Sequence, residues 1–75
     1  MVRLTLNIGK EHGIGPNDLV GTIAYHADIP GNAIGKIHIE NQKSFVDVPE
    51  GLVPLVMKQV GKYKIRKQPI TVSLE

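Results

Sequence analysis

The sequence has 75 residues, enough for one domain with a small core. Its hydrophobic (41%) and charged (21%) fractions are typical of globular proteins and exclude a disordered chain. The absence of cysteine excludes disulfides, thiolate metal sites and cysteine nucleophiles, and no apolar run approaches the roughly 20 residues of a membrane span. Because the first residues also lack the pattern of a signal peptide, we expect one cytoplasmic domain over residues 1–75.

The N-terminal third predicts a strand, a loop and a helix. Apolar and polar residues alternate over 2–8, which is typical of a strand with one buried face. The glycine-rich segment 9–15 predicts a loop, and Pro16 suits the first position of a helix whose apolar spacing continues to Ala27. Gly21 inside this helix costs about 1 kcal/mol relative to alanine, and we expect it to permit a close helix–sheet approach.

A hairpin and a second helix are predicted in the middle of the chain. Alternation over 36–40 and 43–48 predicts two strands, joined by a two-residue turn at 41–42. A helix is expected from about 50 to 60, with Pro54 tolerated only in its first turn.

The last part of the chain predicts a short strand at 63–65, a turn at 68–69 and a final strand over 70–74. The order β-α-β-β-α-β indicates an α+β, ferredoxin-like sandwich: a four-stranded antiparallel sheet with two helices on one face. Alternation places the following residues on the open face of the sheet: Arg3, Thr5, Asn7, Lys36, His38, Glu40, Lys43, Phe45, Asp47, Thr71 and Ser73.

The charges are distributed unevenly. Residues 58–75 hold five basic residues and one acidic residue, a net charge of +4, whereas residues 1–57 have a net charge of −2. A cationic edge on a mildly acidic domain is typical of proteins that bind a nucleic-acid backbone, and a solvated surface turn is the alternative. The five basic residues are Lys58, Lys62, Lys64, Arg66 and Lys67, and the stretch 58–67 that holds them is called the basic segment.

The loop over 9–15 lies where phosphate-binding loops occur, between a strand and a helix. It lacks Walker spacing and does not end in Gly-Lys-Ser/Thr. Lys10 and His12 near the helix start predict one phosphate contact, against the alternative of a flexible turn. The histidines lack metal-ligand spacing and no nucleophile–base series is present, so we expect no metal, no cofactor and no catalysis in this domain.

Aromatic residues are few, and each has a different expected place. Phe45 is the only phenylalanine, and alternation places it on the open face, where an exposed ring can stack on a base. The alternative is that it packs under a loop or the C-terminus. Tyr25 is expected at the edge of the first helix, and Tyr63, inside the basic segment, to add stacking beside phosphate contacts.

Several blocks resemble the DbpA/CsdA-type RNA-binding domain, a divergent RNA recognition motif (RRM) from the C-terminus of bacterial DEAD-box RNA helicases. The resemblance covers nearly the whole chain and is most specific around 18–21 and 34–35. The blocks are Leu4-Thr5-Leu6-Asn7-Ile8-Gly9, Pro16-Asn17-Asp18-Leu19-Val20-Gly21-Thr22-Ile23-Ala24, Ile34-Gly35-Lys36-Ile37, Ser44-Phe45-Val46-Asp47-Val48-Pro49 and Ile65-Arg66-Lys67-Gln68-Pro69-Ile70-Thr71-Val72.

The resemblance implies an accessory domain that docks the helicase core of its parent chain onto structured RNA, in some members a ribosomal RNA hairpin. Helicase motifs are absent here, so ATP hydrolysis is expected elsewhere in the parent. Thr5 replaces the usual strand-1 aromatic, so we expect phosphate contacts to outweigh base stacking. The predicted RNA-binding residues are Arg3, Lys10, Lys36, His38, Lys43, Phe45, Lys62, Tyr63, Lys64, Arg66 and Lys67.

Two other functions fit the same element order. An ACT-type domain binds amino acids, and the loop over 9–15 favours it, although it needs no basic segment. A protein-interaction or dimerisation module would use the sheet face or an edge strand, but the charged face disfavours a large dry interface. We expect a monomer without a membrane partner.

Overall fold

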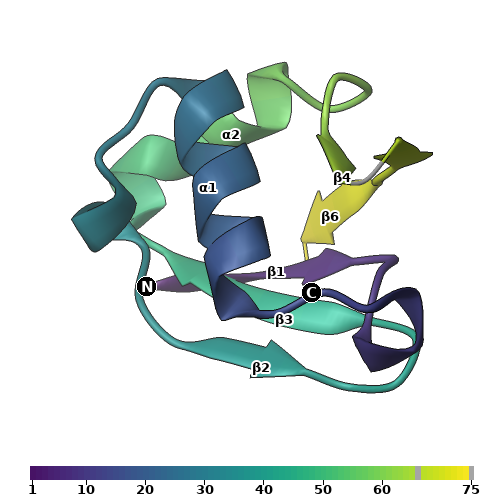
Figure 1. Ribbon diagram of the computed structural model, residues 1–75. Helices are drawn as coiled ribbons and strands as arrows, with labels where there is room; N and C mark the ends of the chain where they lie inside the picture. Colours follow the sequence, from purple (N-terminus) through teal and green to yellow (C-terminus); the bar gives the residue numbers. More distant parts are fainter. Residues whose placement is uncertain (66, 75) are drawn as a thin grey trace.

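The central feature of the computed structural model, which describes residues 1–65 and 67–74, is a four-stranded sheet in the order β2-β3-β1-β6. Every neighbouring pair in it is antiparallel, and α1 and α2 lie together on one side (Figure 1). The predicted α+β, RRM-like architecture is therefore confirmed. The elements are β1 (Val2–Leu6), η1 (Lys10–His12), α1 (Pro16–Ala27), η2 (Gly31–Ala33), β2 (Ile37–Ile39), β3 (Ser44–Val48), η3 (Glu50–Leu52), α2 (Val53–Lys58), β4 (Lys64–Ile65), β5 (Gln68–Pro69) and β6 (Val72–Leu74).

The core lies between the sheet and the helices, where the alternation predicted it. Leu4 and Leu6 of β1 and Val46 of β3 are fully buried and face Leu19 and Ile23 of α1 within one cluster. The residues between them along these strands point to the opposite side, and Ser44, a polar residue on the core side, is buried with its hydroxyl donating to the Ile8 carbonyl. The sheet thus has one apolar face covered by helices and one face free to carry function.

The hairpin between β2 and β3 has the predicted turn. The backbone N–H of Glu40 donates to the carbonyl of Lys43 at 2.8 Å, which closes a two-residue turn at 41–42. The pairing also continues beyond β2, because the N–H of Asp47 donates to the carbonyl of Lys36 at 2.9 Å.

The second helix is shorter than predicted. A 3-10 turn, η3, precedes α2, which ends at Lys58 rather than near residue 60. Pro54 lies at the start of α2, where its missing N–H costs no helical hydrogen bond. Gly61 has a φ of 98°, a left-handed conformation that turns the chain out of the helix and toward β4.

Three further predictions are wrong. Gln68-Pro69 is a strand, β5, that pairs with β4 through Lys64↔Pro69 and Ile65↔Gln68, and the final strand begins at Val72 rather than at residue 70. Gly21 does not face the sheet: it is exposed, and within residues 1–65 and 67–74 no atom of a neighbouring element lies within 4 Å of an added Cβ.

Candidate nucleic-acid interface

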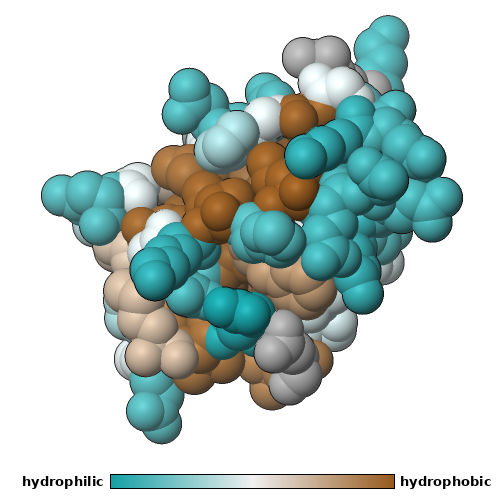
Figure 2. All heavy atoms as spheres, turned by 90° about the horizontal axis from the view of Figure 1, so that it is seen from below, coloured by the Kyte–Doolittle hydropathy of each residue, from teal (hydrophilic) through white to brown (hydrophobic). Residues whose placement is uncertain are grey.

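One row of side chains crosses all four strands of the open face. His38 of β2 is opposite Phe45 of β3, Phe45 is opposite Thr5 of β1, and Thr5 is opposite Ser73 of β6. Figure 2, which views the sheet side, shows apolar atoms across the middle of the molecule with hydrophilic side chains around and between them. The open face is therefore a mixed surface rather than a uniformly charged one.

Phe45 lies in this row with cations and an imidazole around its ring. The His38 ring stacks beside it with a centroid distance of 6.1 Å and an interplanar angle of 24°. Lys43 Nζ is 5.5 Å and Arg3 Cζ is 5.8 Å from the ring centroid, within cation–π range. The placement of Phe45 on the open face is as predicted, and its ring is half-buried by these neighbours rather than fully exposed.

Carboxylates pair with the cations of the open face. Arg3 Nε lies 3.4 Å from Asp47 Oδ1, and Glu40 lies 3.8 Å from Lys43 Nζ and 3.4 Å from His38 Nε2. Exposed pairs of this kind are worth about 0–1 kcal/mol, so a phosphate can displace the carboxylate at small cost. The ion pairs thus keep the cations near Phe45 and still leave them able to bind a phosphate.

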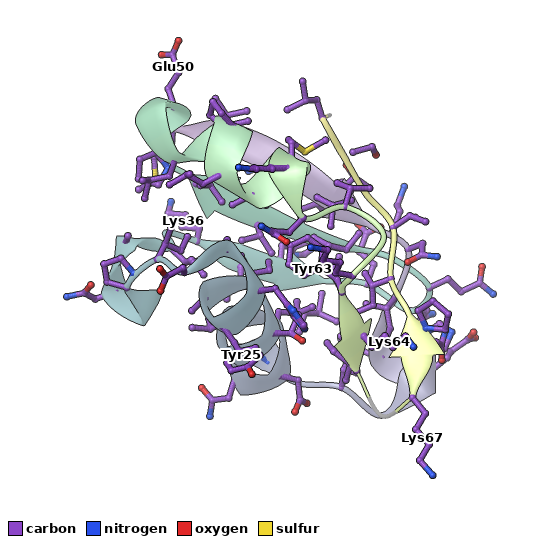
Figure 3. All side chains as sticks on the ribbon, turned by 90° about the horizontal axis from the view of Figure 1, so that it is seen from above. Tyr25, Lys36, Glu50, Tyr63, Lys64 and Lys67 are labelled. Carbon is purple, nitrogen blue, oxygen red and sulfur yellow. The ribbon has the colours of Figure 1, made fainter. Side chains whose placement is uncertain are left out.

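Lys36 and Lys10 lie outside the Phe45 cluster. Lys36 is exposed just before β2, and Figure 3 shows its side chain well apart from Lys64 and Lys67. Lys10 opens η1 at the end of the sheet, where its backbone N–H donates to the carbonyl of Glu40 at 2.8 Å.

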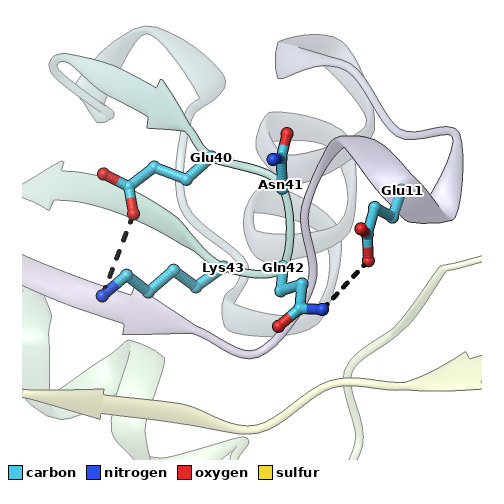
Figure 4. Close-up of a pocket in the computed structure, with 5 residues that line it drawn as sticks. All are labelled: Glu11, Glu40, Asn41, Gln42 and Lys43. Carbon is cyan, nitrogen blue, oxygen red and sulfur yellow. Dashed lines mark hydrogen bonds and ion pairs between the residues drawn. The ribbon is translucent and has the colours of Figure 1, made fainter.

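The loop over 9–15 is docked on the β2–β3 turn. Glu11 N–H donates to the Asn41 carbonyl at 2.9 Å, and Gly9 lies so close to that turn that an added Cβ would collide with its backbone. Glu11 and Gln42 also line the shallow hollow between loop and turn (Figure 4). The loop is therefore held against the β2–β3 turn by backbone hydrogen bonds.

The predicted phosphate contact at the helix start is disfavoured by the cap of α1. Asp18 Oδ2 accepts the N–H of Gly15 at 2.8 Å, which places a carboxylate where a phosphate would have to bind. The His12 side chain is also engaged, because its Nδ1 accepts the N–H of Gly9 at 3.1 Å.

The basic segment forms a second cationic region, on the β4–β5 hairpin and the turn before it. Lys62, Lys64 and Lys67 are exposed, and Figure 3 shows the Lys67 side chain extending away from the body of the molecule. Thr22 Oγ1 of α1 donates to the Lys64 carbonyl at 2.9 Å, so the hairpin is fastened beside the helix. Arg66, predicted to bind RNA, lies outside the described residues.

Tyr63 is buried, which corrects its prediction as a stacking residue. Its side chain has 0% exposure and its hydroxyl donates to the Val56 carbonyl at 2.7 Å. Burial raises the pKa of the Tyr63 phenol to about 12. The alternation of Lys62, Tyr63, Lys64 and Ile65 was the signal that assigns Tyr63 to the core.

Most of the predicted residues therefore separate into two regions, with Lys10 of η1 outside both. The open face holds Arg3, Lys36, His38, Lys43 and Phe45. Lys62, Lys64 and Lys67 form the other region, and Figure 1 shows β4 at the level of the helices rather than of the sheet. Sequence reasoning gave little weight to Tyr25, which is 81% exposed on α1 and lies beside His26 with a ring-centroid distance of 5.1 Å.

Comparison with known proteins gives one consistent family. A family model described as the DbpA RNA binding domain matches residues 3–74. The ATP-dependent RNA helicase DeaD of Escherichia coli (strain K12) is 26% identical over 69 residues, which cover 92% of this chain and 11% of that helicase. The DeaD of Buchnera aphidicola is 28% identical over 92% of this chain and 12% of its own length.

The chain thus spans about a tenth of the length of the curated relatives it matches. None of the helices in the described part is long and apolar enough to cross a bilayer.

Proposed function

The chain belongs to the DbpA RNA-binding domain family, and from this membership we propose that it is the RNA-binding module of an ATP-dependent RNA helicase. Its role is to hold the helicase core of its parent chain on structured RNA, with ribosomal RNA as the proposed target. ATP hydrolysis is assigned to the parent chain and not to this domain.

The observation that carries this proposal is the cluster around Phe45. An aromatic ring on a central strand, with Lys43 and Arg3 5.5 and 5.8 Å from its centroid, combines a surface for a base with cations for the adjoining phosphates. Neither an amino-acid-binding module nor a dry dimer interface requires this combination.

The composition of the row predicts how RNA is read. Phe45 is flanked by His38 on β2 and by Thr5 on β1, and Ser73 follows Thr5 on β6. The hydroxyl groups of Thr5 and Ser73 form hydrogen bonds but do not stack. One base is therefore stacked, and the other contacts are to phosphates and 2′-hydroxyls. Such a surface selects RNA by shape more than by a long sequence, which suits a folded target.

The carboxylates add a small cost, about 0–1 kcal/mol for each pair, that a phosphate beside the cation recovers. RNA must displace Asp47 from Arg3, or Glu40 from Lys43, to gain the full attraction of either cation. A single strand that cannot present phosphates at both places gains less. We therefore expect a preference for a folded hairpin.

A fluorescence-anisotropy titration tests the proposal. The 75-residue protein is titrated into a labelled ribosomal hairpin and into a single strand of the same composition, at several salt concentrations. The expected result is tighter, salt-sensitive binding of the hairpin. Equal weak binding of both would reduce the domain to a generic cationic anchor, and no binding at low salt would refute the proposal.

A further inference from the structure

The outer face of α1, with the basic hairpin beside it, has features that neither the core nor the open sheet face explains. We propose that this surface, the α1–β4 face, binds a single-stranded RNA segment that adjoins the RNA held on the sheet. This proposal rests on the proposed RNA-binding function and adds a second RNA-contact surface to the domain. The face consists of Gly21, Thr22 and Tyr25 of α1 with Lys62, Lys64 and Lys67.

Gly21 is the first reason. A glycine in the middle of a helix destabilises it, and the usual compensation is close packing against another element. Among the described residues Gly21 has no such packing, because none of their atoms outside the helix lies within 4 Å of the place its Cβ would take. No contact in the described part of the chain therefore requires a glycine here. The space over the helix is instead open to the backbone of a partner.

Tyr25 is the second reason, because it stands one helical turn from Gly21 on the same side. Its side chain is 81% exposed, the largest exposure among the large hydrophobic residues of the described part. The His26 ring meets it edge-on at 5.1 Å and in turn meets the buried Tyr63 ring at 5.6 Å. Tyr25 is thus an exposed ring supported from the core side.

The lysines identify the partner as a polyanion. Lys64 is adjacent to this part of α1, since its carbonyl accepts the Thr22 hydroxyl hydrogen bond at 2.9 Å. Among the described residues, Lys62, Lys64 and Lys67 are exposed and have no ion pair. Unpaired lysines beside an exposed aromatic ring match a phosphate backbone with its bases.

The RNA on this face is single-stranded because a ring can stack only on a base that has left its duplex. The acidic residues at the two ends of the helix, Asp18 and Asp28, repel phosphates and restrict the contact to its middle. The footprint is therefore short. A nucleotide over Tyr25 has its phosphates toward Lys64, and Gly21 leaves room for its sugar.

The test uses two substitutions on this face and one control. Gly21→Gln fills the open space with a good helix former, so it is expected to raise the melting temperature and still weaken RNA binding. Tyr25→Ala removes the ring, and Tyr25→Phe keeps it. The control is Gly51→Gln, which also fills open space but lies in η3.

Binding is measured with two labelled RNA probes, a blunt hairpin and the same hairpin with a single-stranded extension. For the wild-type protein, the extension is expected to increase affinity at least about fivefold, the lower end of a base–aromatic stack. Gly21→Gln and Tyr25→Ala should abolish that increase and leave binding of the blunt hairpin unchanged. Tyr25→Phe and Gly51→Gln should retain the increase.

Three outcomes overturn the proposal. If the extension adds nothing to wild-type affinity, or if Tyr25→Ala and Gly21→Gln retain the full increase, the α1–β4 face does not bind RNA while the sheet-face function stands. If the wild-type protein binds neither probe, the proposed function itself fails.

Discussion

The open face of the sheet and the basic segment both carry cationic side chains, but these side chains differ in whether they form ion pairs. On the open face, Arg3 and Lys43 each lie within 4 Å of a carboxylate and within 6 Å of the Phe45 ring centroid. On the basic segment, Lys62, Lys64 and Lys67 have no ion pair among the described residues. From this difference we expect the open face to discriminate between RNAs and the basic segment to supply attraction to any of them.

The largest expected effect comes from removing the unpaired lysines. In the triple variant Lys62→Gln, Lys64→Gln, Lys67→Gln, RNA affinity should fall strongly, and the slope of log K against log salt should become shallower by roughly two to three. The reason is that each lost phosphate contact releases about 0.7–0.9 fewer counterions. Anisotropy titrations at several salt concentrations measure both quantities.

The folded state provides the control for this triple variant. All three side chains are exposed, so the melting temperature should change little. An unchanged salt slope in a variant that remains folded would show that the basic segment is only a solvated turn.

The next effect concerns Phe45. Phe45→Ala should cost roughly 1–3 kcal/mol of binding, the range of a base–aromatic stack, while the salt slope stays as in the wild type. Phe45→Leu is the matched variant, because it keeps an apolar side chain without a π-face. Equal affinity of the wild type and both variants would mean that the ring only packs against its neighbours.

A smaller effect concerns stability at high pH. It comes from Tyr63, the residue of the basic segment that is buried in the core. The Tyr63 phenol has a pKa of about 12 in the fold and about 10 in the unfolded chain. Between these values the unfolded chain loses the proton first, so the contribution is complete below pH 10 and declines as the pH rises toward 12.

Tyr63→Phe tests this linkage. The variant should be less stable near neutral pH by about 0.5–1.5 kcal/mol, the value of the hydrogen bond to Val56, and its stability should fall less steeply above pH 10. Denaturant titrations across this range measure the difference. Parallel pH profiles for the two proteins would contradict the assignment of Tyr63 to the core.

The smallest expected effect is on the open face. Glu40→Gln removes the carboxylate shared by His38 and Lys43, so RNA affinity should rise a few-fold with a stability change of about 0.2–1 kcal/mol. Glu50→Gln removes the same charge from an exposed site that points away from the body in Figure 3, and it should have less effect. Equal gains from both would indicate general electrostatics rather than a carboxylate at the site.

The sequence predicted the parts of the fold that depend on the regular spacing of apolar residues along strands and helices. Alternation along β1 and β3 assigned both faces of the sheet, including Phe45 in the row that crosses it. Helical spacing and Pro16 gave the bounds of α1. Within these elements the local pattern and the buried face agree.

The remaining parts depend on contacts between distant segments. Gly21 was misplaced because it faces solvent on a helix whose orientation is set by the sheet. Tyr63, which lies between α1 and α2, was misplaced for another reason: the lysines on either side of it indicated a surface segment, although the alternation of residues 62–65 places it in the core. The division of the cations into two regions follows from the β4–β5 hairpin, where a proline that predicts a turn lies in a short strand instead.

The measurement that tests the central claim most directly is an amide NMR titration of the 75-residue protein with the RNA hairpin. We predict chemical-shift changes at Thr5 and Phe45 on the sheet and at Lys64 and Lys67 on the β4–β5 hairpin of the protein. The amide of Leu55 on α2 should be unaffected. Changes confined to the lysines, with Thr5 and Phe45 unmoved at saturation, would contradict a sheet face that reads RNA.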